Sequence, residues 1–356
     1  MDKSIVPVNQ IAARSSTDYK FSNPNRAEVV EIEDDPVEVV DKQMEELKLN
    51  HQFNEKDVPQ IFQDLMKGKM NRSKDIAFYV YDQYCTIILD EMKLTWEKKG
   101  KDWLISYESI KNAIKTDDPE KSIIDHLWFV LKNPNIKLSI FQIRACKTPQ
   151  FEVVCQNQLV PKIDFEKVNT LLQSMFNTFD HQIHVKAFCC EAFSISMFLS
   201  MLKHLKPRAL VGIEFNISWK NEQNYEKMKE TIATDQWKQA KSINSAKVIP
   251  PLKIEDLLHC KDFMLKFEVI TPEDVIRARE LFINSTNSQS CYLCFGNEPL
   301  DINAFRKVLL PNSLSERTVN MLLFEYIVFT YKLPNSPNCL EMLLSHINIV
   351  FEKKPN

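Results

Sequence analysis

The stretch from 235 to 295 alternates short extended runs with helix-like segments, and this alternation most limits how the chain can fold. In the run 264–270, apolar residues alternate with Lys266 and Glu268, a period near two that is typical of a half-buried strand. The next residues, 271–274 (TPED), predict a helix start. Thr caps free backbone N–H groups, Pro fits the first turn, and the two acids face the positive end of the helix dipole. Strand, capped helix and strand therefore form one unit.

The same unit recurs upstream and predicts an α/β fold class. Helix-like segments separate successive strand candidates, and most of the spacings lie near the roughly 20–30 residues of a leucine-rich-repeat unit. Because a parallel connection needs a helix's length of chain, we expect the strands side by side in one sheet, with the helices on a single face. The predicted architecture is an irregular leucine-rich-repeat-like strand–helix solenoid with a helical N-terminal cap. Its strand candidates are 138–143, 183–188, 211–217, 243–248, 264–270 and 290–295.

Three runs in this region carry a family resemblance: FLSMLKHLKPRALVGIEF, TDQWKQAKSIN and IEDLLHCKDFMLKFEVITPEDVIRARELFINSTNSQSCYLCF. They resemble the FTH (Fog-2 homology) domain of the nematode F-box A proteins, which has a Leu-Lys-Pro motif before a strand, a QWKxAK helix end and an I-(S/T)-x-E-D turn. The late segment FTYKLPNSPNCLEMLLSHINIVFEK is similar to the family's closing strands. On this resemblance, residues 96–354 are an FTH-like α/β repeat domain.

Residues 1–50 differ from the rest of the chain in composition. Ser, Asn, Asp and Glu dominate, and residues 31–38 form an acidic run around a proline. Apolar residues are too sparse to bury a face, so the sequence predicts a disordered acidic leader.

Residues 51–95 predict a helical segment, in which Pro59 fits the first turn and Ile61, Phe62 and Leu65 lie on one helical stripe. In relatives of the FTH family an F-box occupies this position, a three-helix module that docks on the SCF adaptor. Two interpretations stay open. Either the segment is a divergent F-box and these four side chains contact the adaptor, or its helices pack on the core as a structural cap.

The following residues predict one hairpin and two helices. Residues 92–107 alternate in part around a Lys-Lys-Gly-Lys turn at 98–101, which is typical of a β-hairpin. Helical segments are expected at 109–114 and 119–131, the second capped by the acids before Pro119.

Composition and charge exclude several classes of function. A net charge of −3 gives no reason to expect a polyanion partner, so no nucleic-acid partner is expected, and no membrane partner is expected either. The four glycines form neither a G-x-G-x-x-G nor a P-loop pattern, so no nucleotide cofactor is predicted and the cofactor prediction is none. We find no G-x-S-x-G, H-E-x-x-H or kinase-type motif, and predict that the protein is not an enzyme.

The nine cysteines are odd in number and scattered, and no apolar signal-peptide core lies near the first residue. They predict free thiols in an intracellular location, cytoplasmic or nuclear. Cys291-x-x-Cys294 has no second ligand pair, and its members point to opposite faces of a strand. His181 and His184 lie at the start of a strand and predict surface histidines, so no metal site is expected.

The sequence therefore predicts a non-catalytic protein-interaction module. The resemblance implies substrate recognition for an SCF-type ubiquitin ligase, with a protein substrate and the SCF adaptor as partners. The alternatives are an FTH-domain binding protein that has lost SCF coupling, and an enzyme whose site is assembled from scattered residues.

Overall fold

A computed structural model describes most of the chain from residue 53 onward. The described residues are 53–67, 73–81, 84–99, 102–107, 110–145, 163–191, 194–217, 223–249, 252–295, 300–321 and 324–355. The predicted leader, 1–50, lies outside them.

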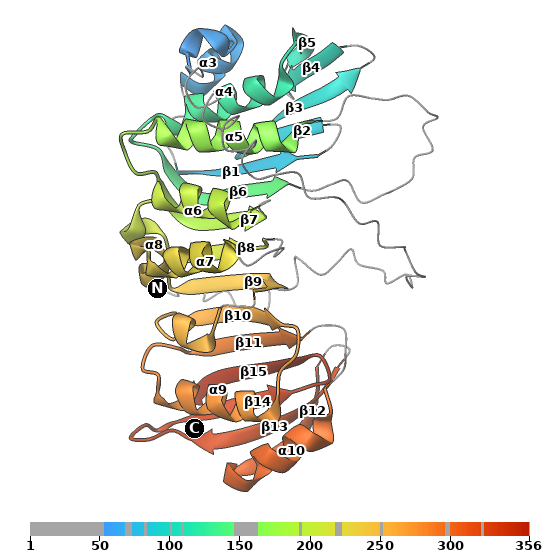
Figure 1. Cartoon of the computed structure of the whole chain (residues 1–356), viewed down its shortest axis with the longest axis vertical. Helices are drawn as coiled ribbons and strands as arrows, with labels where there is room; N and C mark the ends of the chain where they lie inside the picture. Colours follow the sequence, from blue (N-terminus) through green and yellow to red (C-terminus); the bar gives the residue numbers. More distant parts are fainter. Residues whose placement is uncertain are drawn as a thin grey trace, which may run out of the picture. The chain divides into compact units, whose positions relative to one another are not determined.

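One fifteen-stranded sheet runs through the described residues (Figure 1). Its central seven strands are parallel and lie in the order β11-β10-β9-β8-β7-β6-β1. Six of them match the six strand candidates, so the prediction that those strands lie side by side in one sheet is confirmed. Their bounds are β1 (Ser73–Val80), β6 (Lys137–Ala145), β7 (His184–Glu191), β8 (Gly212–Phe215), β9 (Ser242–Val248), β10 (Asp262–Phe267) and β11 (Ser290–Phe295).

Antiparallel strands flank the parallel part on both sides. On one side a meander continues from β1 through β2 (Tyr84–Leu89), β3 (Met92–Lys99), β4 (Asp102–Tyr107) and β5 (Ile110–Thr116). On the other side β15 (Asn348–Pro355) pairs with β11, and β14 (Asn338–Leu344), β13 (Phe324–Lys332) and β12 (Ser315–Met321) follow in order. The predicted hairpin at 92–107 is confirmed, since Lys99 pairs with Asp102.

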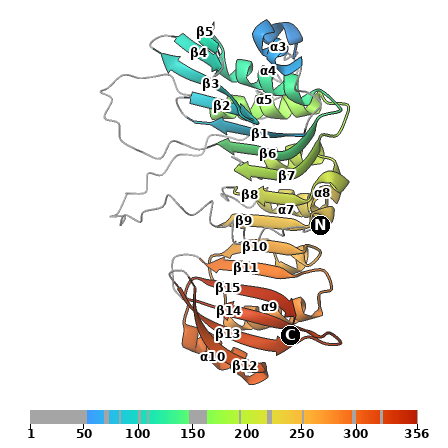
Figure 2. The ribbon, with the colours of Figure 1, turned by 180° about the vertical axis from the view of Figure 1, so that it is seen from behind.

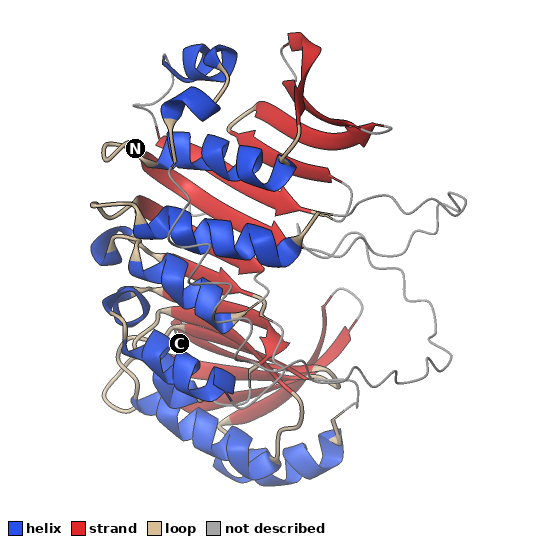
Figure 3. Cartoon of the chain, turned by 45° about the horizontal axis from the view of Figure 1, so that its top comes forward, coloured by secondary structure: helices blue, strands red, loops and turns tan. Residues whose placement is uncertain are grey.

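The helices gather on one face of the sheet, as two views from opposite sides and a tilted view show (Figures 1, 2 and 3). Each parallel crossover carries helix or 3₁₀ turn, because parallel strands cannot be joined by a tight turn. The α-helices are α3 (Gln60–Lys67), α4 (Pro119–Leu131), α5 (Phe165–Asn177), α6 (Ile195–Lys203), α7 (Gln223–Ala233), α8 (Asp235–Gln239), α9 (Pro272–Asn284) and α10 (Ile302–Leu309). The 3₁₀ turns are η1 (Glu55–Asp57), η2 (Pro207–Ala209), η3 (Ile254–Leu257) and η4 (Leu310–Asn312).

An aromatic series fills the core between the parallel strands and the helices. Phe141 of β6 and Phe188 of β7 are paired in register, with ring centroids 5.7 Å apart. The ring centroid of Phe198 on α6 lies 5.8 Å from that of Phe188 and 5.2 Å from that of Phe215 on β8. The ring centroid of Phe215 in turn lies 5.6 Å from that of Trp237. These five side chains are fully buried, so neighbouring strand–helix units share one continuous core.

Helix starts lie where the capping residues predicted them. Thr271 caps α9, and Thr271 and Asp274 form a reciprocal capping box. Asp118 caps α4, which spans Pro119–Leu131 as predicted, and its side chain accepts from the Lys121 amide.

The predicted helical N-terminal cap is not confirmed, because strands occupy most of its range. Within 51–95 the described helices are η1 and α3 alone, and β1, β2 and β3 fill the later residues. A helix was also expected at 109–114, and the described residues of that range, 110–114, belong to β5. Short apolar runs cannot be assigned to strand or helix from periodicity alone, and here pairing in the sheet decided. The fold shown is mixed α/β with one large sheet, and its antiparallel flanks depart from the predicted solenoid.

Candidate functional site

The predicted adaptor-contact residues have different environments on α3. Phe62 is fully buried, with its ring centroid 4.8 Å from that of His126, 5.9 Å from Phe129 and 6.4 Å from Tyr107. The prediction that Phe62 lies on an exposed adaptor-contact surface is therefore corrected, because its side chain is buried in the core. Phe62 packs against the region 96–131, as the structural-cap interpretation predicts, because an aromatic ring gains most by leaving water.

Pro59 and Ile61 are in environments different from that of Phe62. Pro59 is half-buried, and Ile61 is 37% exposed. The side chain of Leu65 lies outside the described part of the structure. Among the predicted contacts whose side chains are described, Ile61 is thus the most open to a partner.

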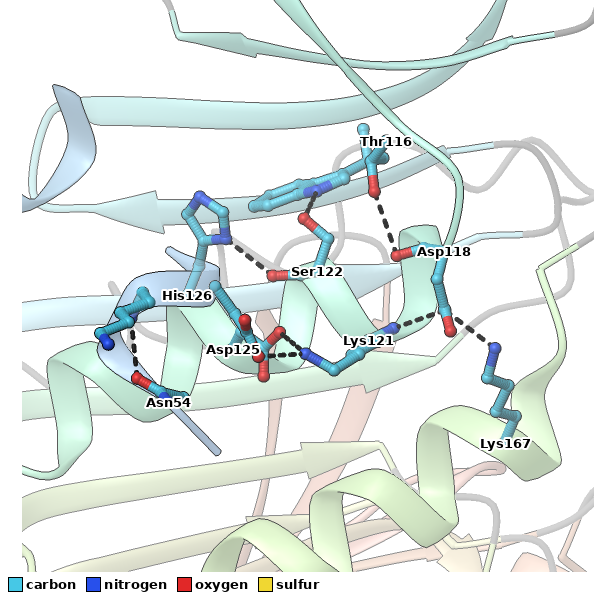
Figure 4. A network of polar contacts seen from close by, with 11 residues as sticks. Asn54, Thr116, Asp118, Lys121, Ser122, Asp125, His126 and Lys167 are labelled. Atoms are coloured by element: carbon cyan, nitrogen blue, oxygen red, sulfur yellow. Dashed lines mark hydrogen bonds and ion pairs between the residues drawn. The ribbon is translucent and has the colours of Figure 1, made fainter. Parts of the chain in front are cut away.

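Polar contacts attach η1 to α4, and α4 to α5 (Figure 4). The Lys121 Nζ donates to Asp57 Oδ2 on η1 and to Asp125 Oδ2 on α4, each at 2.7 Å. At the start of α4, Asp118 Oδ1 accepts from Lys167 Nζ of α5 at 2.8 Å. These ion pairs connect neighbouring elements of the helix layer, which is a structural role.

Asp125 and His126 are buried side by side with opposite pKa shifts. Burial raises the pKa of Asp125 to about 6, although Lys121 acts against this shift. Burial lowers the pKa of His126 to about 4. The Ser122 carbonyl, 2.7 Å away, can only accept, so His126 Nδ1 carries the proton, and Nε2 accepts from the Tyr107 hydroxyl at 3.2 Å. With both ring nitrogens engaged inside the core, His126 acts as a packed core residue.

Burial makes several of the described thiols poor nucleophiles. Burial raises the pKa of Cys189 and of Cys260 to about 12, and that of Cys294 to about 11. Cys291 and Cys294 point to opposite faces of β11, as expected, since Cys291 is buried and Cys294 is half-buried. Among the described residues, no group of three or more His, Cys, Asp or Glu side chains could hold a metal ion.

A shallow hollow of about 250 Å³ lies on the helix side, where α5, α6 and α7 meet. Two lysines and three neutral polar side chains give it a donor-rich wall. Lys203 and Lys227 both pair with Glu230 of α7, the second at 3.1 Å. Hydrogen bonds from Lys203 and Lys227 hold the pKa of Glu230 below its usual value. The hollow is lined by Asn177, Ser196, Leu199, Ser200, Lys203, His204 and Lys227.

Sequence reasoning did not identify this hollow, although a weak signal is present. Ser196, Ser200 and Lys203 recur at spacings of four and three, which places them on one face of a helix. Lys227 comes from the next helix, and only the packing of α6 on α7 brings it to the same place.

Residues 166–312 match the family model of the FTH domain. The matched segment runs from α5 to η4, so it contains β7 to β11 and every residue that lines the hollow. The sequence resemblance to an FTH domain is confirmed over this part of the chain. No curated protein and no solved structure matches the chain. None of the described helices has both the length and the apolar character needed to cross a membrane.

Proposed function

We propose that this chain is a non-catalytic protein-interaction module whose FTH domain recognises a protein substrate for an SCF-type ubiquitin ligase. The observation that carries the proposal is the FTH match over 166–312. Stacked strand–helix units, in the manner of a leucine-rich-repeat-like solenoid, present a row of helices that a partner can contact. The role implies an intracellular location, cytoplasmic or nuclear, and the F-box A relationship implies a nematode source.

The burial of Phe62 favours a second version of this function, an FTH-domain binding protein without SCF coupling. An F-box needs apolar side chains free for the adaptor, and it needs further helices after the first. Here Phe62 fills a core site, and the residues after α3 that the structure describes enter strands β1 and β2. In the coupled version, Ile61 and the face of α3 around it would contact the adaptor.

The proposal that no reaction is catalysed rests on the groups available for chemistry. The thiols at Cys189, Cys260 and Cys294 stay protonated near neutral pH, and the buried His126 has both ring nitrogens engaged. An enzyme would need convergent titrating groups in a pocket, as catalytic sites have.

A pull-down of the SCF adaptor tests the coupled version. The full chain and two variants, I61D and V269D, are compared after each is shown to be folded by circular dichroism. Val269 is 75% exposed, so V269D makes the same chemical change away from α3. Adaptor capture by wild type and V269D but not by I61D would support SCF coupling. No capture by wild type would leave the uncoupled version, and equal capture by all three would contradict a contact through α3.

A further inference from the structure

The hollow between α5, α6 and α7 gathers hydrogen-bond donors from three helices. Ser196 and Ser200 lie one turn apart on α6, and Asn177 is the last residue of α5. Within the described residues, these three side chains have no hydrogen-bond partner. Lys203 and Lys227 add two positive charges at the rim, each about half exposed. None of the lining residues is acidic.

The nearby carboxylate balances the lysines only in part. Glu230 forms ion pairs with the ammonium groups of both Lys203 and Lys227. Because it carries a single negative charge, one positive charge remains uncompensated beside the hollow. A carboxylate has two oxygens, and those of Glu230 are used by the lysines. The donors on α5 and α6 are left for a second anion, one with more acceptor oxygens than a carboxylate has.

We propose that this hollow binds a phosphomonoester carried on a serine or threonine of a protein partner. A phosphate of this kind carries about −1.5 to −2 charges at neutral pH and three acceptor oxygens. Lys203 and Lys227 neutralise its charge, while Ser196, Ser200 and Asn177 donate to its oxygens. The inference names the chemistry of the partner, and to that extent it rests on the proposed function.

The hollow has room for a phosphorylated side chain. Its volume of about 250 Å³ leaves space for carbon atoms of the side chain beside the phosphate group. The buried Leu199 supplies an apolar contact for the carbon stem of such a side chain. His204, at the end of α6, lies close enough to report on the bound charge.

The test is a titration of the full chain with a short neutral phosphoserine peptide, its unphosphorylated form, and inorganic phosphate. Binding is followed by fluorescence anisotropy of a labelled peptide and by the proton signals of the His204 ring. We expect the phosphopeptide to bind and to shift His204, the unphosphorylated peptide to do neither, and inorganic phosphate to bind at least tenfold more weakly.

Variants separate this site from general attraction to a basic surface. K203M and K227M should each weaken phosphopeptide binding at least tenfold, and E230Q should tighten it severalfold, because it removes the carboxylate that competes for both lysines. K229M is the matched control, since Lys229 is on α7 but pairs with Glu226 outside the hollow, and it should leave the affinity unchanged.

Three results would overturn the inference: no binding of the phosphopeptide, an equal loss with K229M and K203M, or inorganic phosphate binding as tightly as the peptide. The adaptor pull-down is independent of these lysines. If the phosphopeptide does not bind but the adaptor is still captured, the phosphate site is rejected and the proposed function is unaffected.

Discussion

The FTH segment and the N-terminal region differ in how their strands find their neighbours. From β7 to β11, each strand pairs with the next strand of the chain, and a helix or 3₁₀ turn lies in the connection between them. In the N-terminal region β1 pairs with the next strand, β2, on one side, but its other partner is the parallel strand β6, which follows the whole β2–β5 meander and α4. One of the two partners of β1 is thus set by a distant contact.

This difference explains why the sequence predicts the secondary structure of the FTH segment better than that of the N-terminal region. Local units repeat the same capping and periodic signals, so one stretch of sequence is enough to identify them. A strand whose partner is far along the chain carries no local signal for its pairing. The docking of η1 and α3 likewise depends on groups of α4, such as Lys121 and His126, that come more than 50 residues later.

The largest expected effect is in the shared aromatic core of the FTH segment. F198A removes a fully buried ring that touches both Phe188 and Phe215, and should cost about 3–5 kcal/mol of the free energy of unfolding. Urea denaturation measures this loss. The 64% exposed Leu314 gives the control L314A, which should stay within about 0.5 kcal/mol of wild type. A loss with F198A as small as that of the control would show that the units do not share one core.

F62A should act on the N-terminal region alone. The ring of Phe62 is as buried as that of Phe198, but α3 lies at the end of the helix layer and can detach while the sheet stays folded. We expect a smaller loss of global stability than with F198A, and faster hydrogen exchange limited to 53–67 and 119–131. Faster exchange that extended equally to β7–β11 would contradict the separation of the two regions.

The free energy of unfolding of D125N should depend on pH in a way that is offset in wild type. Between pH 4 and 6, the folded protein takes up a proton at Asp125, whose pKa is raised, so acid stabilises the fold. Over pH 4 to 6.5, the unfolded chain takes up a proton at His126, because the pKa of this residue is lowered in the folded state. Acid therefore destabilises the folded state through His126. The two contributions oppose each other in wild type.

In D125N only the His126 contribution remains. The stability of D125N relative to wild type should therefore fall as the pH falls from 6 to 4, by up to about 1.4 kcal/mol per pH unit. Urea unfolding of both proteins at a series of pH values measures the difference, from which the other titrating groups cancel. A difference that does not change with pH would show that Asp125 is ionised throughout this range.

The smallest effect is expected at the start of α9. T271A removes the side chain that caps the Asp274 amide, and should cost about 1 kcal/mol. T271S keeps the hydroxyl and should lose less than half as much, by the same denaturation measurement. Equal losses with Ala and Ser would place the effect in packing of the Thr methyl group and not in the cap.

The sequence by itself determined the strand–helix units of the central region and the caps that begin their helices. Thr271 and Asp274, and likewise Asp118 before Pro119, satisfy the backbone groups of their own first turns, and such interactions need no distant partner. The FTH resemblance rested on the same local segments, and it is confirmed over residues 166–312.

Only the tertiary structure decided the strand conformation of β1, β2 and β5, the burial of Phe62, and the meeting of Lys203 with Lys227 across two helices. In each case the stabilising free energy comes from groups far apart in the chain. A short apolar run becomes strand when a sheet edge accepts its hydrogen bonds, and a helical stripe becomes core when another surface covers it. Periodicity shows that such a face exists, and packing decides what covers it.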